Sequence, residues 1–253
     1  MALLDVREVT VRFGGIVALD GLSFSIDAGK ICGLIGPNGA GKTTMFNVVS
    51  RIYNPTAGRV DFDGHDLLAL PAHRIASVGI ARTFQNLALF PTMSLLDNVM
   101  VGAHSQGRIG FGRAITRIGA QRENKRIRQF AGELLQELGL APLAHRPAAG
   151  LPFGTLKRLE IARALAARPK FLLMDEPAAG LTHGEVDELG ETVVQIRDEF
   201  DLTVLLVEHH MAMVMKISDQ VVAMDFGRKI AEGDPETVRQ DPKVIEAYLG
   251  TSA

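Results

Sequence analysis

Hydrophobic and polar positions alternate in two stretches near the start of the chain. Residues 4–11 begin irregularly and then alternate, while residues 22–26 alternate throughout. A period of two is typical of a strand with one face in the core and one in solvent. The pattern therefore predicts two half-buried antiparallel strands, with a turn at residues 12–15 between them.

Four later runs are almost entirely apolar, at residues 31–35, 171–174, 203–207 and 221–224. Such runs are typical of strands buried on both faces of a parallel sheet. Helical spacing appears between them, most clearly in the apolar stripe Leu156, Leu159, Ala162, Leu165 and Ala166. Strands that alternate with helices predict an α/β fold with a helix-covered parallel sheet.

From residue 95 to residue 140 the pattern is helical, with an irregular glycine-rich part at 102–119 and an amphipathic stretch at 130–138. Basic residues crowd this region: Arg108, Arg113, Arg117, Arg122, Lys125, Arg126 and Arg128. A solvated face explains them, and proximity to anionic lipid head groups is the alternative. The lack of a clean apolar stripe beside the charges favours the solvated face.

A glycine-rich loop directly follows the apolar run at residues 31–35. Residues 36–44 fit the phosphate-binding template of glycine, four residues and Gly-Lys-Ser/Thr, and the required strand and helix flank them. The glycines let backbone N–H groups turn inward around a phosphate, and the helix N-terminus adds positive partial charge. We expect Lys42 to reach the β- and γ-phosphates and the Thr43 hydroxyl to bind Mg²⁺. The predicted nucleotide-binding residues of the loop are Gly36, Asn38, Gly39, Ala40, Gly41, Lys42, Thr43 and Thr44.

Polar residues end two of the other apolar runs. Asp175 and Glu176 follow residues 171–174, and His209 lies just past residues 203–207. Ligands of parallel sheets bind at the carboxyl ends of the strands, so these side chains should converge with the glycine loop. Adjacent residues at a strand end point to opposite sides. Asp175 can therefore face Mg²⁺, while Glu176 can polarise an attacking water as a general base.

Composition excludes several classes of protein. With 253 residues, 47% hydrophobic and 22% charged, the chain can bury a large core and is not expected to be disordered. Its net charge of −2 lacks the basic balance of a general nucleic-acid binder. No run approaches the ~18 apolar residues of a membrane span, so a membrane process would need other subunits. Cys32 is the one cysteine, which fits a reducing compartment and excludes an internal disulfide.

Taken together and in order, these motifs resemble the ATP-binding subunits of ABC transporters over essentially the full chain. Residues 36–44 match the Walker A loop, and residues 171–176 match Walker B with its catalytic glutamate. Phe13 sits where the family places its adenine-stacking aromatic residue, Gln85 matches the Q-loop glutamine, and His209 matches the switch histidine. The resemblance implies ATP and Mg²⁺ as cofactors.

The resemblance also implies roles for these residues. Gln85 would meet Mg²⁺ beside Thr43 and Asp175, and would link the site to a membrane subunit. His209 would contact the γ-phosphate. The implied catalytic set is Glu176, His209, Gln85 and Lys42.

Residues 151–155 lie at the position of the family's signature motif, just before a predicted helix at 157–167. The usual Leu-Ser-Gly-Gly-Gln is altered, with Pro152 for serine, Phe153 for the first glycine and Thr155 for glutamine, while Gly154 is kept. In the family this motif reaches the ATP of a second subunit. Here Phe153, Gly154 and Thr155 would do so through backbone N–H groups and the helix N-terminus. Thr182 also stands where an aspartate is common, which affects communication between the two sites.

Within the family, the closest likeness is to ATPases of branched-chain amino-acid importers. It rests on residues 82–85, 158–163, 176–181 and 244–250, and the insertion around 102–128 favours the larger of two paralogous ATPases. Urea importers and lipopolysaccharide exporters use similar ATPases. The implied architecture is a P-loop NTPase (RecA-like) parallel-sheet core with an N-terminal antiparallel β subdomain, at 1–85 and 158–253. A helical subdomain at 86–157 is inserted into it.

The resemblance further implies partners and a location. The partners are integral membrane permeases, a second ATPase subunit (self or paralogue) and, indirectly, a solute-binding protein, at the cytoplasmic face of the inner membrane. No nucleic-acid partner is expected. Leu87, Leu89 and Phe90, after Gln85, either contact a membrane partner or pack inside the helical subdomain.

Two other classes are weighed against transport. Soluble ABC ATPases that act on DNA or ribosomes usually need a long coiled-coil insertion or two ATPase halves, and neither is present. A P-loop kinase or GTPase is the other class, and the lack of an Asn-Lys-x-Asp guanine-reading motif argues against the GTPase.

Overall fold

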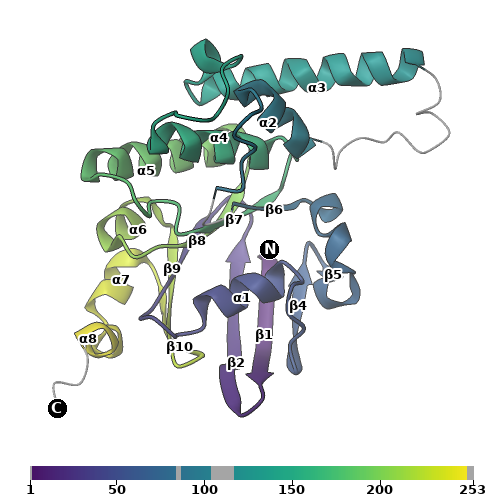
Figure 1. The fold of residues 1–253 in the computed structure, drawn as a ribbon. Helices are drawn as coiled ribbons and strands as arrows, with labels where there is room; N and C mark the ends of the chain where they lie inside the picture. The colour runs from purple at the N-terminus through teal and green to yellow at the C-terminus, as the bar shows by residue number, and fades with distance from the viewer. Residues whose placement is uncertain (1, 84–86, 104–116, 250–253) are drawn as a thin grey trace. The chain divides into compact units, whose positions relative to one another are not determined.

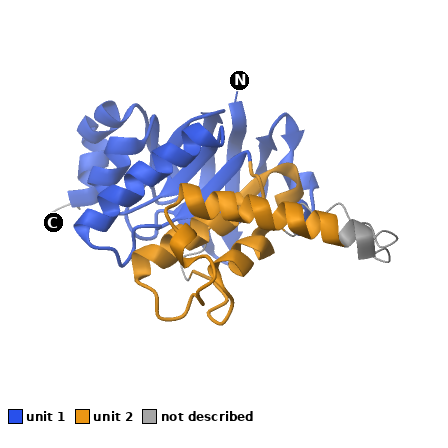
Figure 2. Ribbon diagram, turned by 90° about the horizontal axis from the view of Figure 1, so that it is seen from above, with its two compact units in different colours: residues 1–75, 170–253 blue, residues 76–169 orange. Residues whose placement is uncertain are grey.

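A computed structural model describes residues 2–83, 87–103 and 117–249, with the backbone alone at 117–120. The chain divides into two compact units, shown in Figure 2. Unit 1 comprises residues 1–75 and 170–253, and unit 2 comprises residues 76–169. Across the described ranges, no helix has the length and apolar character needed to span a bilayer.

Unit 1 contains an antiparallel sheet with the strand order β2-β1-β4-β5 (Figure 1). Its strands are β1 (Ala2–Phe13), β2 (Ile16–Asp27), β4 (Ala57–Phe62) and β5 (His65–Asp66). The alternating stretches near the N-terminus therefore form paired antiparallel strands, as predicted. The pairing runs up to Phe13 and Ile16, so the turn is shorter than residues 12–15.

The second sheet of unit 1 runs in the order β10-β9-β3-β8-β7. It contains β3 (Ile31–Ile35), β7 (Phe171–Asp175), β8 (Thr203–Val207), β9 (Gln220–Asp225) and β10 (Arg228–Gly233). The pairs β3–β8, β3–β9 and β7–β8 are parallel, whereas β9–β10 is antiparallel. Every residue of β3, β7 and β8 is buried. The predicted α/β fold with a parallel core and an added antiparallel sheet is therefore confirmed.

Helices of unit 1 follow the strands of this sheet. They are α1 (Lys42–Val49), α5 (His183–Glu199), α6 (Met211–Ile217), α7 (Pro235–Gln240) and α8 (Pro242–Leu249). Helix α1 contacts both β2 and β7, and α6 contacts β3. Short 3₁₀ turns, η1 (Leu67–Ala69) and η2 (Ala72–Arg74), follow β5.

Cys32 lies fully buried on β3, between β8 and β9. Burial raises the pKa of its thiol, so it remains protonated and unreactive in the folded chain. Its place in the core fits the expectation of a small apolar residue rather than a reactive thiol.

Unit 2 is mainly helical. It contains η3 (Ala76–Val78), β6 (Ile80–Arg82), α2 (Leu95–Gly102), α3 (Arg117–Glu137), η5 (Ala141–Leu143) and α4 (Phe153–Leu165). Helix α3 starts well before the predicted amphipathic stretch. Its basic residues within the described side chains are exposed: Arg122, Lys125, Arg126 and Arg128. Arg108 and Arg113 lie outside the described residues, as does the side chain of Arg117.

Candidate functional site

The glycine loop joins β3 to α1, as its sequence context required. Gly39 and Gly41 have φ angles of 84° and 100°, in the left-handed region that favours glycine. Space is also restricted, because a Cβ at Gly36 would lie 2.2 Å from the carbonyl oxygen of Met224. A Cβ at Gly41 would lie 2.6 Å from that of Ala18. The close approach of neighbouring backbone therefore requires glycine at both ends of the loop.

The side chain of Lys42 folds back along this loop. Its Nζ donates hydrogen bonds to the carbonyl oxygens of Gly36, at 2.6 Å, and Pro37, at 3.0 Å. The residue is only 6% exposed. Burial lowers the pKa of Lys42, and the negative charges of Glu176 and Asp175 oppose that shift. A cation is thus held at the mouth of the loop, facing two carboxylates.

A cavity of about 370 Å³ opens in front of the loop and brings most of the predicted site together. Its predicted lining residues come from the loop and from the ends of β7 and β8: Asn38, Gly39, Gly41, Lys42, Thr43, Thr44, Glu176 and His209. The carboxyl ends of β3, β7 and β8 supply these side chains, which is the usual place for a ligand in such a sheet. The cavity can accept a phosphate chain between backbone N–H groups, a lysine and a carboxylate.

Glu176 and His209 contact each other directly across this cavity. His209 Nε2 lies 3.0 Å from Glu176 Oε1. Glu176 has a φ of 48° and its N–H donates to the carbonyl oxygen of Val207 at 2.8 Å, which turns the chain away from β7. A histidine that holds a carboxylate in this way can orient it toward a water molecule.

Asp175 ends β7 and is buried beside the loop. Its charge acts on Lys42, so the carboxylate faces the same region. Together with the Thr43 hydroxyl on α1, it offers the oxygen ligands that Mg²⁺ prefers. These two residues would therefore suit a magnesium ion, which would neutralise phosphate charge. Gln85, the third predicted ligand, lies outside the described residues.

Phe13 lies on β1 but is not among the residues that line the cavity. It is 45% exposed, and its ring packs edge-to-face on Tyr53 at a centroid distance of 5.0 Å. The cavity is bordered instead by Ile16, Val17 and Phe226. Phe226 is 83% exposed in the turn between β9 and β10. Sequence reasoning missed these three apolar residues, although the Asp-Phe-Gly turn marks an aromatic residue at a strand end.

Glu208 was also not assigned a role from the sequence. It is buried at the end of β8, and its carboxylate accepts three backbone N–H groups. The donors are Ala178 at 2.7 Å, His209 at 2.7 Å and His210 at 3.1 Å. Glu208 therefore ties the chain after Glu176 to the chain that carries His209. The sequence feature that could have identified Glu208 is a carboxylate directly after a buried strand.

The signature-like segment at 151–155 lies in unit 2. Helix α4 starts at Phe153, and the preceding Pro152 gives it no side-chain cap. Thr155 is buried, and Lys157 pairs with Glu160 at 3.8 Å inside the unit. The first N–H groups of α4 thus have no capping side chain, which leaves them suited to an anion.

Thr182 has a local structural explanation. Its backbone N–H and hydroxyl both donate to Glu185 Oε2, at 2.9 and 2.8 Å, at the start of α5. A threonine followed three residues later by glutamate forms a capping box. Thr182, which replaces the common aspartate, therefore caps the N-terminus of α5.

Removal of the His209 imidazole should slow ATP turnover. We expect His209→Ala to lower kcat by about tenfold to a hundredfold, the usual cost of a hydrogen bond to a charged group. Steady-state phosphate release measures it. His210→Ala is the matched control, because His210 does not line the cavity. Equal rates for both variants and the unchanged protein would contradict a role for His209.

Comparison with known proteins agrees with this geometry. Residues 19–179 match the ABC transporter family, and residues 228–253 match the family "Branched-chain amino acid ATP-binding cassette transporter". The chain is 42% identical to the high-affinity branched-chain amino acid transport ATP-binding protein BraF of Pseudomonas aeruginosa, over 98% of both chains. It is 40% identical to LivG of Escherichia coli K12, again over 98% of both chains.

A solved structure shows the same architecture. The ADP conformation of MJ1267, an ATP-binding cassette of an ABC transporter, is 32% identical and covers 99% of both chains with a TM-score of 0.84. Both the sequence and the fold therefore lead to one assignment. The chain belongs to the ABC transporter family, as one of its ATP-binding and ATP-hydrolysing subunits.

Proposed function

We propose that this chain powers an importer of branched-chain or other hydrophobic amino acids. The observation that carries the proposal is the cavity that joins the glycine loop, Glu176 and His209. Similarity to BraF and LivG over nearly the whole chain, and the match of residues 228–253, support amino-acid import. Urea import and lipopolysaccharide export are the competing transport functions.

The proposed reaction is in-line attack of water on the γ-phosphate of ATP. Glu176 accepts the proton of that water as general base, and the contact with His209 orients its carboxylate. Lys42 and His209 stabilise the charge on the γ-phosphate. Thr43, Asp175 and Gln85 would hold Mg²⁺, which would supply further charge neutralisation. Phe13 stacks on the adenine, and the remaining residues of the loop hold the phosphates with backbone N–H groups.

The complete site is proposed to need a second ATPase subunit, self or paralogue. Phe153, Gly154 and Thr155 of one subunit would approach the ATP bound to the loop of the other. The uncapped start of α4 supports this, because its free N–H groups and dipole favour an anion. Hydrolysis would then remove the phosphate that bridges the two subunits.

Membrane permeases are proposed to contact the loop at 87–90, at the cytoplasmic face of the inner membrane. Phe90 is partly exposed, and Asn98 on α2 hydrogen-bonds both its N–H, at 2.9 Å, and its carbonyl, at 3.0 Å. Arg163 on α4 donates to the carbonyl oxygens of Leu87 and Ala88. Force on this loop would reach α4, which carries the signature-like segment. We assign residues 86–157 to the helical subdomain and 1–85 and 158–253 to the nucleotide-binding core.

Co-expression with the membrane proteins encoded beside this gene tests the proposal. We expect the tagged chain to co-purify with them, and vesicles of the complex to take up labelled leucine only when ATP is supplied on the side of this chain. The matched control is the same complex with Glu176→Gln, which should not transport. ATP-driven uptake of urea, or co-purification with ribosomes or DNA, would overturn the proposal.

A further inference from the structure

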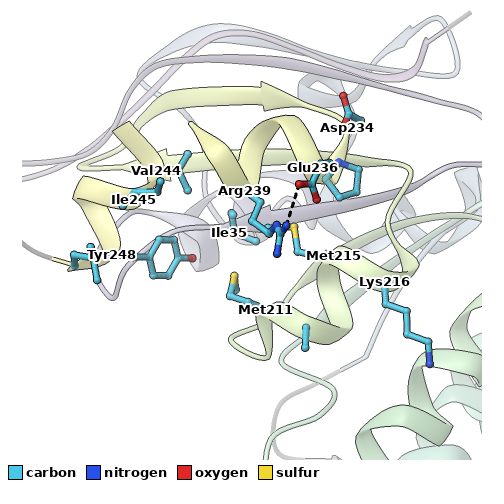
Figure 3. A pocket seen from close by; sticks show the side chains of 13 residues that line it. Ile35, Met211, Met215, Lys216, Asp234, Glu236, Arg239, Val244, Ile245 and Tyr248 are labelled. Carbon is cyan, nitrogen blue, oxygen red and sulfur yellow. Dashed lines mark hydrogen bonds and ion pairs between the residues drawn. The ribbon is translucent and has the colours of Figure 1, made fainter. Parts of the chain in front are cut away.

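A side chain of the C-terminal helix α8 forms a hydrogen bond with the start of the glycine loop. The N–H of Gly36 donates a hydrogen bond to the hydroxyl oxygen of Tyr248 at 2.7 Å, across 212 positions of sequence. Figure 3 shows Tyr248 extending from the helix toward the side where Ile35 lies, the last residue of β3. The start of the loop is thus bound to the end of the chain.

Gly36 is a sensitive point in the loop. Its carbonyl oxygen accepts the Lys42 Nζ at 2.6 Å, and its Cα lies so near the backbone of Met224 that no Cβ fits. The Tyr248 hydroxyl fixes its N–H on the other side of the residue. A small shift of Gly36 would therefore move an acceptor of Lys42, the cation that faces the cavity.

Cavities flank the junction between α8 and the loop. One, of about 910 Å³, is lined by Ile35, Val244, Ile245 and Tyr248 together with residues of α6 and α7 (Figure 3). Another, of about 570 Å³, is lined by residues 37–40 together with Lys243, Glu246 and Ala247. Beside these cavities, the Tyr248 hydroxyl connects α8 directly to the first residue of the loop.

We propose that Tyr248 is a positioning residue that holds Gly36, and through it Lys42, in the arrangement that binds the triphosphate. The inference rests on the proposed phosphate-binding role of residues 36–44. Burial raises the pKa of the Tyr248 phenol, while its bond from Gly36 acts in the opposite direction, so the hydroxyl stays neutral near pH 7. Preorganising a loop in this way strengthens binding because less freedom is lost when ligand arrives.

Tyr248→Phe tests the link, because it removes the hydroxyl and keeps the ring. We expect the Kd for a fluorescent ATP analogue and the KM for ATP each to rise by about threefold to tenfold, the cost of one hydrogen bond. The kcat should change by less than about twofold, since the general base is untouched. By NMR, the Gly36 amide of the nucleotide-free protein should exchange its hydrogen faster.

Leu249→Ala is the matched control on the same helix, because Leu249 is 77% exposed and its side chain has no hydrogen-bonding group. It should leave the KM and the exchange of Gly36 unchanged, even if the melting temperature falls. Tyr248→Phe with unchanged KM and unchanged Gly36 exchange would overturn the inference. An equal rise of KM in both variants would also overturn it, because loosening of α8 alone would then explain the effect.

The binding measurements distinguish failure of this inference from failure of the proposed phosphate-binding site. If the unchanged protein binds ATP and Lys42→Ala does not, the phosphate-binding role stands whatever Tyr248→Phe shows. If the unchanged protein binds no nucleotide, both proposals are overturned together.

Discussion

ATP turnover should fall by about a hundredfold to ten-thousandfold when Glu176 is replaced by glutamine, while nucleotide binding persists. The amide has nearly the same shape as the carboxylate but accepts no proton from the attacking water. His209 Nε2, 3.0 Å from Glu176 Oε1, can still hydrogen-bond the amide oxygen. The geometry of the cavity is therefore retained and only the base is lost.

Phosphate release and the Kd for a fluorescent ATP analogue measure the two halves of this prediction. Glu191→Gln is the matched control, because Glu191 is exposed on α5 and outside the cavity. It should leave both quantities unchanged. Undiminished turnover in Glu176→Gln would exclude this residue as the base, and lost binding would point to a structural role.

The strands of unit 1 were predictable because burial is recorded in the local pattern of residues. Two-sided burial makes β3, β7 and β8 apolar at almost every position, and one-sided burial makes β1 and β2 alternate. Their carboxyl ends then had to meet at one edge of the sheet. The sequence pattern therefore predicts that Lys42, Glu176 and His209 lie near one another.

Helix α3 shows where the local pattern gives less information. The sequence predicted a helical pattern over residues 95–140, irregular at 102–119 and amphipathic at 130–138, whereas the helix begins at Arg117, inside the irregular part. Its first half, as far as the side chains are described, is largely exposed and polar. The exposed half of a helix has no apolar stripe, so periodicity does not mark the residue at which the helix begins.

Supporting residues of the site could not be predicted because their partners are distant in sequence. Glu208 accepts a hydrogen bond from the N–H of Ala178, which is 30 positions away in the sequence. Tyr248 accepts one from the N–H of Gly36, which is 212 positions away. Neither the residue type nor the sequence spacing predicts such a contact. These residues emerge only once the strands and helices are placed, whereas the glycine loop is contiguous and carries its own signal.

Loss of the Lys42 ammonium should abolish nucleotide binding rather than chemistry alone. Lys42→Ala removes the ammonium that donates to Gly36 and Pro37 and that would bind phosphate, and it leaves the negative charges of Glu176 and Asp175, which act on Lys42, without that cation. Each charge-assisted bond to phosphate is worth roughly 1.5–3 kcal/mol. We therefore expect the Kd for ATP to rise by about a hundredfold or more, with hydrolysis lost in parallel.

Titration with a fluorescent ATP analogue measures this, with Lys243→Ala as the control for removing a nearby positive charge. Lys243 lines the neighbouring cavity and not the one in front of the loop. Wild-type affinity in Lys42→Ala would contradict the phosphate-binding role of the loop.

Lys42→Ala also tests how the affinity for ATP depends on pH. Burial lowers the pKa of Lys42, so the free protein loses this charge at a lower pH than an ordinary lysine would. Bound triphosphate favours the charged form, so affinity for ATP should fall as pH rises through that lowered pKa. Lys42→Ala should lack this fall. Glu176→Gln keeps Lys42 but removes a negative charge that raises the Lys42 pKa, so its affinity for ATP should still fall with rising pH, and the fall should come at a lower pH than in the unchanged protein. The two variants thus separate the group that binds the phosphates from the group that activates water.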